Sequence, residues 1–224
     1  MQLKAVLLDL DGTLVDTAPD LVAVLNAVLK ENGQTAVPYA IARNAVSDGV
    51  LGLLRLGFGP DLQKTDLESL RRRFIDIYIA HTPIKSILFN GIINILNNLE
   101  ESKIRWGIVT NKPAKMTLPL LKALGICDRA TSIISGDRLP QCKPHPAPLL
   151  LAAEEVGVLP FQCVYVGDAR RDVTAGQAAG MRTIVAAYGY IPPSEDPNSW
   201  GADCVIRRPA ELPSVLAKLT FAAQ

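Results

Sequence analysis

Strand and helix patterns alternate along most of this 224-residue chain, and that alternation limits the possible folds more than any other feature. Short apolar runs typical of buried strands recur, and from about residue 92 onward stretches of helical spacing separate them. The expected strands are Ala5–Leu8, Arg105–Val109, Thr131–Ile134, Cys163–Val166, Thr183–Ala186 and Cys204–Ile206. Such alternation forms a parallel sheet that helices cover on both faces. The sequence therefore predicts an α/β fold with a doubly wound parallel sheet.

The first apolar run is followed by a segment, from about Asp16 to His81, that contains helical patterns only. Helices are expected from about residue 19 to 33, after residue 38, around residues 50–57 and from about 66 to 80. Four helices with short connections favour a small bundle. We therefore predict a core domain of residues 1–15 and 82–224 with an inserted helical cap of residues 16–81. An insertion at this point lies over the end of the first strand, where a lid would lie.

Two carboxylates, Asp9 and Asp11, come directly after the first apolar run. Open α/β sheets bind their ligands at the carboxyl ends of strands, and residues two apart on a strand point to the same side. Crowded carboxylates repel unless a cation lies between them, and Mg²⁺ prefers such oxygen ligands. An EF-hand loop is excluded because Leu14 stands where it needs glycine. A strand-end Asp is also a common cap or turn residue, so the pair alone leaves structure and catalysis open.

Other strand ends carry polar residues as well. Thr110 and Asn111 follow one expected strand, and their hydroxyl and amide groups can donate to a phosphate oxygen. Lys143 lies between prolines, which hold its direction. Asp168 ends a further strand, and Asp172 follows one helical turn later on the same face. Each of these residues alone fits a cap or a surface charge, whereas polar groups at four strand ends together indicate a site.

The composition excludes several classes of function. A net charge of +1 gives no electrostatic support for binding nucleic acid or an anionic membrane surface. No apolar run is long enough to span a membrane, and the carboxylates in the N-terminal segment make it a poor signal peptide. Four cysteines without Cys-x-x-Cys spacing are typical of free thiols, so we expect a cytoplasmic protein. The one basic cluster, Arg71–Arg73, lies in a helical pattern and is expected on a solvated face.

The order of these motifs resembles that of the haloacid dehalogenase-like (HAD) phosphatase superfamily. The resemblance rests on Asp9–Thr13, Thr110–Asn111, Lys143–Pro144 and Gly167–Asp168 with Asp172, and it extends through nearly the whole chain. The helical insertion is similar to the helical-bundle cap that family members place on their Rossmann-like core. Within the superfamily the chain is similar to the phosphoglycolate phosphatase group, and its tail resembles that of N-acetylmuramic acid 6-phosphate phosphatases.

The resemblance implies a Mg²⁺-dependent phosphomonoesterase. Asp9 would attack the phosphate and form an aspartyl-phosphate, and Asp11 would act as general acid and then as general base. The Asp9 carboxylate, the Asp11 backbone carbonyl and Asp168 would hold the Mg²⁺ ion. Asp172 would contribute to the metal site either directly or through water.

The resemblance also implies how a small phosphate ester would be bound. Thr110 and Asn111, with Lys143, would hold the phosphate oxygens. Arg43 would read a carboxylate, which 2-phosphoglycolate and N-acetylmuramate 6-phosphate both carry, although a solvated helical arginine fits the pattern equally well. Lys112 has no evident catalytic use and is expected at the surface on the pocket rim.

Other functions share parts of this pattern. A phosphosugar mutase of the same superfamily uses the same nucleophile, and a broad sugar-phosphate phosphatase also stays open. A dehalogenase needs no acid two residues after its nucleophile, so Asp11 argues against that chemistry. A phospho-accepting receiver domain also places Asp residues at strand ends, but it is much shorter and lacks the helical insertion. The sequence leaves open which ester is the substrate and what the oligomeric state is.

Overall fold

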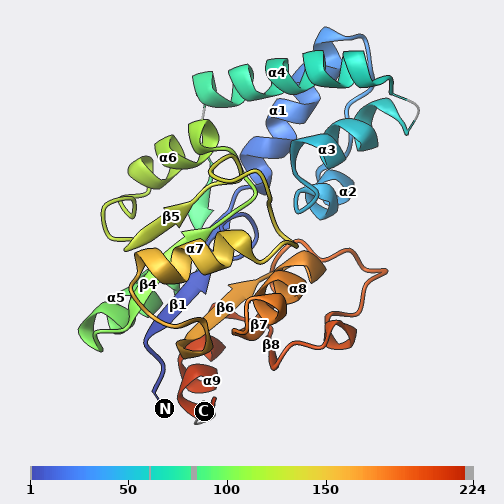
Figure 1. Cartoon of the computed structure of the whole chain (residues 1–224). Helices are drawn as coiled ribbons and strands as arrows, with labels where there is room; N and C mark the ends of the chain where they lie inside the picture. The colour runs from blue at the N-terminus through green and yellow to red at the C-terminus, as the bar shows by residue number, and fades with distance from the viewer. Residues whose placement is uncertain (1, 61, 82–84, 220–224) are drawn as a thin grey trace.

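A parallel sheet forms the centre of the larger part of the molecule (Figure 1). The computed structural model describes residues 2–60, 62–81 and 85–219. In those residues the sheet has the order β5-β4-β1-β6-β7-β8, and every neighbouring pair is parallel. The strands are β1 (Ala5–Leu8), β4 (Arg105–Val109), β5 (Ser132–Ile134), β6 (Cys163–Gly167), β7 (Arg182–Ala186) and β8 (Cys204–Ile206). The predicted α/β fold with a doubly wound sheet is confirmed.

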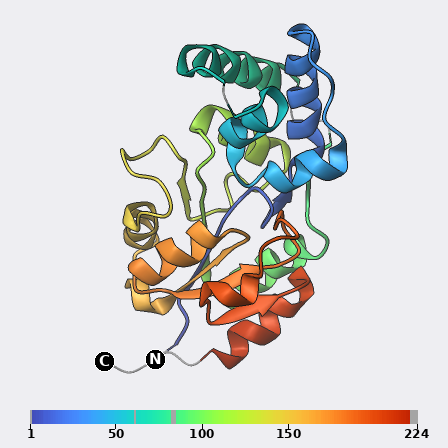
Figure 2. The ribbon, with the colours of Figure 1, turned by 90° about the vertical axis from the view of Figure 1, so that its right-hand side faces the viewer.

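Helices cover both faces of this sheet (Figures 1 and 2). Side chains alternate along β1, so Val6 and Leu8 pack into one apolar layer and Ala5 and Leu7 into the other. One layer is completed by α5 (Ile92–Glu101), α6 (Ala114–Ala123) and α9 (Leu212–Lys218), the other by α7 (Ala147–Glu155) and α8 (Arg170–Ala178). Burial on both faces explains why the strands are continuous apolar runs.

The strand order places a ligand site at the end of β1. The chain connections that follow β1 run to one side of the sheet, and those that follow β6 run to the other. Adjacent strands whose connections diverge leave a crevice at their carboxyl ends, where open sheets bind ligands. Asp9 and Asp168 directly follow β1 and β6, respectively.

A separate group of helices lies beyond these carboxyl ends (Figures 1 and 2). It consists of α1 (Ala18–Glu31), α2 (Tyr39–Ala42), α3 (Gly49–Phe58) and α4 (Lys64–His81), and we call it the helical block. Apolar side chains such as Leu25, Leu53 and Phe74 form its own core. The second expected helix is a single turn that continues as the 3₁₀ segment Arg43–Ala45.

A short antiparallel pair joins the helical block to the sheet. It pairs β2 (Val15–Asp16), where the chain leaves, with β3 (Ile87–Leu88), where it returns. The carboxylate of Asp20 accepts hydrogen bonds from the backbone of Lys85 and Ser86 beside it. The division at residues 15/16 and 81/82 stays a prediction, and residues 82–84 lie outside the described part.

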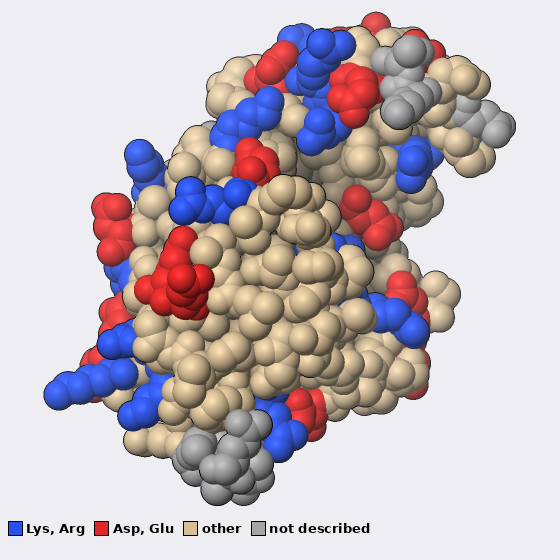
Figure 3. All heavy atoms as spheres, viewed as in Figure 1, with Lys and Arg blue, Asp and Glu red and all other residues tan. Residues whose placement is uncertain are grey.

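The surface shown in Figure 3 carries interspersed acidic and basic side chains, in line with the net charge of +1. The four cysteines are free thiols, as predicted. Among the described residues, no helix has the length and apolar character needed to cross a membrane.

Candidate active site

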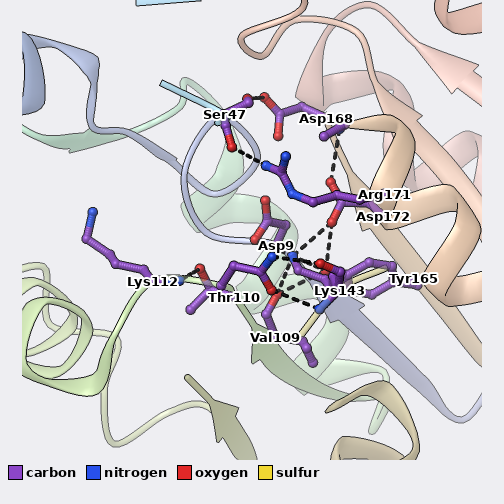
Figure 4. A network of polar contacts seen from close by, with 12 residues as sticks. Asp9, Ser47, Val109, Thr110, Lys112, Lys143, Tyr165, Asp168, Arg171 and Asp172 are labelled. Atoms are coloured by element: carbon purple, nitrogen blue, oxygen red, sulfur yellow. Dashed lines mark hydrogen bonds and ion pairs between the residues drawn. The ribbon is translucent and has the colours of Figure 1, made fainter. Parts of the chain in front are cut away.

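Asp9 lies at the centre of a buried polar cluster (Figure 4). Its side chain is buried just beyond β1, and its backbone N–H donates to the carbonyl of Val166 at 2.8 Å, so the neighbouring strand fixes its position. The Nζ atom of Lys143 donates to Asp9 Oδ1 at 2.8 Å. The same ammonium donates to the Val109 carbonyl at 2.9 Å and contacts the Tyr165 hydroxyl at 2.7 Å. The lysine is therefore a buried charge held in one direction.

Asp168 and Asp172 complete the cluster. One oxygen from each of these carboxylates and one from Asp9 lie within 4.8 Å of one another. The two Asp172 oxygens serve the protein itself, because Oδ1 lies 2.8 Å from Lys143 Nζ and Oδ2 accepts the Ala169 N–H at 2.9 Å. Asp172 therefore caps α8 and holds the lysine.

Asp168 has one oxygen to spare. Its Oδ2 accepts hydrogen bonds from the Ser47 hydroxyl at 3.0 Å and from the Tyr190 N–H at 2.8 Å. Its Oδ1 is buried and has no hydrogen-bond partner among the described residues. A buried carboxylate oxygen without a partner is costly, so its presence beside Asp9 fits a site for a hard cation.

The pKa shifts of the cluster also favour a bound cation. Burial raises the pKa of Asp9 to about 6, although the charge of Lys143 opposes the shift. Burial, with the charges of Asp9 and Asp172 adding to it, raises the pKa of Asp168 to about 7. Burial lowers the pKa of Lys143, but the charges of Asp172 and Asp9 outweigh burial and hold it above its usual value. The charge of Arg171 opposes both carboxyl shifts as well, so the raised pKa values of Asp9 and Asp168 favour a further cation beside Lys143 and Arg171.

Two glycines make room beside Asp168. Gly12 has φ +86°, and a Cβ atom there would lie 2.1 Å from Asp168 Oδ2. A Cβ atom at Gly189 would lie 2.4 Å from the Asp168 Cβ atom. Any side chain at either position would displace this carboxylate, so the cluster requires glycine at both.

Asp11 lies on the open side of the cluster and has two partners of its own. Its Oδ1 accepts hydrogen bonds from the Thr17 hydroxyl at 2.6 Å and from Lys112 Nζ at 2.9 Å. The expectation that Lys112 lies at the surface is wrong: it is buried, with Nζ 4.7 Å from the ring centroid of Tyr78 on α4. Burial lowers the pKa of Lys112, but the interactions with Asp11 and Tyr78 together outweigh burial and raise it. Sequence patterns give no signal for this contact, because it joins the sheet to the helical block.

Thr110 and Asn111 have different places in the site. The Thr110 hydroxyl is buried and accepts the Lys112 N–H at 3.1 Å, which leaves its own hydrogen available for a ligand. The Asn111 side chain is bound to Lys143, because its Nδ2 donates to the Lys143 carbonyl at 2.9 Å and its Oδ1 accepts the Lys143 N–H at 3.0 Å. Asn111 therefore fixes the segment that carries the buried lysine.

A cavity of about 220 Å³ separates these groups from the helical block. The predicted residues that line it on the sheet side are Asp9, Asp11, Thr110, Asn111 and Lys143. Arg43 is not among the lining residues: its Nη1 donates to the Gly189 carbonyl at 3.2 Å, and its guanidinium carbon lies 4.8 Å from the centroid of the Tyr190 ring. The structure therefore does not bring Arg43 together with the other predicted site residues.

Two arginines that the sequence reading missed do line the cavity. Arg171 on α8 is bound to the backbone carbonyl of Ser47, so it connects the carboxylate cluster to the helical block (Figure 4). The basic cluster on α4 is divided: Arg72 and Arg73 are exposed as predicted, but Arg71 faces the cavity. The helical spacing alone cannot reveal this, because the cavity-facing side of α4 depends on how the block sits on the sheet.

The structure therefore places strand-end carboxylates around a buried lysine, on a doubly wound sheet with a helical insertion. The family model described as haloacid dehalogenase-like hydrolase matches residues 6–186. The chain is 39% identical over 216 residues to an N-acetylmuramic acid 6-phosphate phosphatase of Pseudomonas putida, covering 96% of this chain and 97% of that protein. It is 43% identical over 209 residues to a phosphoglycolate phosphatase of Xanthomonas campestris pv. campestris, covering 93% and 94% of the two chains.

A solved structure of a similar protein has the same fold. The crystal structure of a predicted phosphoglycolate phosphatase from Haemophilus somnus matches with a TM-score of 0.85 at 27% identity, and the match covers 96% of this chain and 98% of that one. The chain belongs to the haloacid dehalogenase-like hydrolases. It is an enzyme of the phosphatase type.

Proposed function

We propose that this enzyme hydrolyses small acidic phosphate esters by a Mg²⁺-dependent mechanism in which Asp9 forms an aspartyl-phosphate. The observation that carries the proposal is the buried cluster at the end of β1, where Asp9 meets Lys143 and the spare oxygen of Asp168. The cluster faces a cavity that the helical block closes from the other side, so we also propose that residues 16–81 act as a cap.

The reaction has two displacements. An Asp9 oxygen attacks phosphorus, and the bond between phosphorus and the ester oxygen breaks as the new bond forms. Asp11 gives its proton to the departing alcohol oxygen. In the second step Asp11 takes a proton from the water that attacks the aspartyl-phosphate, which releases phosphate and restores Asp9. Thr110 and Lys143 hold the phosphate oxygens while charge spreads over them.

Mg²⁺ fits the carboxylate cluster. Asp9 and Asp168 would hold it, together with the backbone carbonyl of Asp11, and Asp172 would act indirectly because both of its oxygens bind the protein. When bound, Mg²⁺ neutralises the like charges of the nucleophile and the phosphate. The chain's own lysine adds to that effect, since Lys143 already pairs with Asp9.

The relatives support the substrate class. One is named for N-acetylmuramic acid 6-phosphate and another for phosphoglycolate, and both of these compounds carry a carboxylate besides the phosphate. We therefore propose a small phosphate ester with a second acidic group as the substrate.

Replacing the nucleophile tests the mechanism. We expect Asp9→Asn to lower kcat about a thousandfold or more on both acidic esters and on para-nitrophenyl phosphate, in the presence of Mg²⁺. Asp76→Asn, which changes an exposed carboxylate on α4, is the matched control and should retain wild-type turnover. Phosphate release measures both variants, and turnover by Asp9→Asn close to that of the wild type would refute Asp9 as the nucleophile.

A further inference from the structure

We propose that Arg71 on α4 binds the carboxylate of the substrate and that the apolar side chains around it contact the rest of the ester. This inference rests on the proposed function, because it assigns the acidic group of the substrate to a particular residue. Arg71 lines the same cavity as Asp9 but belongs to the helical block, so an ester whose phosphate lies at Asp9 extends toward it.

The other cations of the cavity are already engaged by the protein. Lys143 is held by Asp9 and Asp172, each at 2.8 Å. Lys112 is paired with Asp11 at 2.9 Å. These lysines can assist the phosphate chemistry, but their charge is largely balanced before a second acidic group arrives.

Arg171, the remaining cation besides Arg71 among the described residues of the cavity, also has partners within the protein. It donates to the Ser47 carbonyl, and the charges of Asp172, Asp9 and Asp168 raise its pKa against the effect of burial. The acidic residue that the helical block contributes to the lining, Asp48, also acts on Arg171. The charges of Asp9, Asp48, Asp168 and Asp172 therefore already act on Arg171 before a substrate binds.

Arg71 is held much less firmly. Its one ionic partner among the described residues is Glu68, one turn earlier on α4, with Nη1 3.7 Å from Oε2. The two side chains are 38% and 54% exposed, so this pair contributes little and exchanges easily. A guanidinium carries several N–H donors and pairs best with a carboxylate through two parallel hydrogen bonds. At 3.7 Å, the contact between Arg71 and Glu68 is too long to be a hydrogen bond.

The wall that the helical block and α6 contribute to the cavity is mainly apolar, with Ser47 and Asp48 as polar members besides Arg71. The lining residues from the helical block and from α6 include Leu21, Val46, Val50, Leu51, Ile75 and Met116. Such a wall provides few partners for the hydroxyl groups of a neutral sugar, and unpaired hydroxyls are costly to bury. It suits an ester whose far end combines a carboxylate with methyl or methylene groups, such as a lactyl ether or a glycolate.

Matched substrates separate this role from general binding. N-acetylmuramate 6-phosphate and N-acetylglucosamine 6-phosphate differ by the lactyl ether that carries the carboxylate, and 2-phosphoglycolate and ethyl phosphate form a smaller pair. We expect Arg71→Gln to lower the ratio of kcat/KM between the acidic and neutral members of the preferred pair about tenfold or more, mainly through KM. Arg71→Lys, which keeps the charge, should restore part of this ratio. Arg72→Gln makes the same change at an exposed neighbouring position and should keep the wild-type ratio.

The outcomes distinguish the inference from the proposed function. If Arg71→Gln keeps the wild-type ratio while Asp9→Asn abolishes turnover, the role of Arg71 is overturned and the phosphatase mechanism stands. If the wild type releases no phosphate from any of the four esters, the proposed function fails, and the Arg71 assignment fails with it. Thermal unfolding of each variant shows that a change in ratio does not arise from loss of the fold.

Discussion

At the scale of single residues, the contacts of Asp11 bear directly on the proton transfer proposed for it. Its Oδ1 is shared by the Thr17 hydroxyl and the Lys112 ammonium, while Lys112 also lies over the ring of Tyr78. A proton carrier must reach the ester oxygen from one direction, and these contacts hold the carboxylate at the open side of the cluster. In the proposed mechanism Lys112 therefore positions Asp11, and Tyr78 connects this pair to the helical block.

Substitution of Lys112 tests that role. We expect Lys112→Met to lower kcat about tenfold or more on alkyl phosphates and much less on para-nitrophenyl phosphate, whose leaving group departs without a proton. Lys115→Met, an identical change at an exposed site on the nearby helix α6, should leave both rates as in the wild type. Rates on a series of leaving groups measure the difference. Equal losses on alkyl and nitrophenyl esters would contradict a role through the general acid.

The residues that could be predicted from the sequence share one property, namely that their position follows from local structure. Asp9 and Asp168 come directly after parallel strands, and such positions meet at one edge of the sheet. Asn111 and Arg43 show the limit of reasoning from residue type. Both have donors that suit a ligand, but the Asn111 side chain binds the Lys143 backbone at the cavity wall and Arg43 binds Gly189, so their roles toward a substrate stay predictions.

At the scale of elements, the loop after β7 connects the sheet to the helical block. The Tyr190 hydroxyl donates to Asp16 Oδ1 at 2.7 Å and accepts the Ala18 N–H at 2.9 Å, at the start of α1. The Tyr190 N–H donates to Asp168, and the ring stacks under Arg43 of the block. One buried side chain thus contacts the first helix and the 3₁₀ segment of the block, while its backbone contacts the carboxylate cluster.

This connection has a measurable effect on stability. Tyr190→Phe removes a hydroxyl that serves the buried Ala18 N–H and the partly buried Asp16 carboxylate, so we expect it to lower the free energy of unfolding by about 1–3 kcal/mol. Tyr188→Phe removes one hydrogen bond, to the Thr13 carbonyl, and should cost less, about 1 kcal/mol. Urea unfolding of both variants makes the comparison. A larger loss in Tyr188→Phe would be inconsistent with the central place given to Tyr190.

Most elements could be predicted because each has an internal period or an apolar run. The strands of the large sheet are such runs, and α1 and α4 repeat apolar residues at helical spacing. The pair β2 and β3 was not predicted, since strands of two residues are too short to show a period. The short helix α9 was also missed, and its position is set by packing of Leu212 and Leu216 against the sheet.

At the scale of the whole molecule, the active site belongs to neither part alone. The sheet supplies the carboxylates and Lys143, whereas the helical block supplies Arg71 and the apolar wall. Lys112 and Arg171 belong to the part that contains the sheet, and their side chains contact the helical block. Which side of each helix faces the cavity is decided by how the two parts pack, and no local pattern encodes that arrangement. This is why the sequence predicts the strand-end residues of the cavity more completely than those that the helical block contributes.

The carboxylate cluster also couples the stability of the whole protein to pH and metal. Burial raises the pKa of Asp9 to about 6 and that of Asp168 to about 7, from an ordinary value of 3.8. Between about pH 4 and pH 7 the metal-free native state therefore binds more protons at these groups than the unfolded chain does. Linkage then requires their contribution to the free energy of unfolding to fall as the pH rises through that range.

Comparison with Asp168→Asn isolates this contribution, because the variant cannot titrate at that position. In EDTA, we expect the wild type to lose stability relative to Asp168→Asn as the pH rises from about 4 to about 7.5. Mg²⁺ at pH 7.5 should reverse the loss, since a ligand that binds the native state stabilises it, and the variant should gain less. Urea unfolding across this pH series, with and without Mg²⁺, provides the measurement. A wild type that gains stability over the variant with rising pH in EDTA would show that Asp168 ionises without penalty, which is incompatible with a crowded cluster that needs a cation.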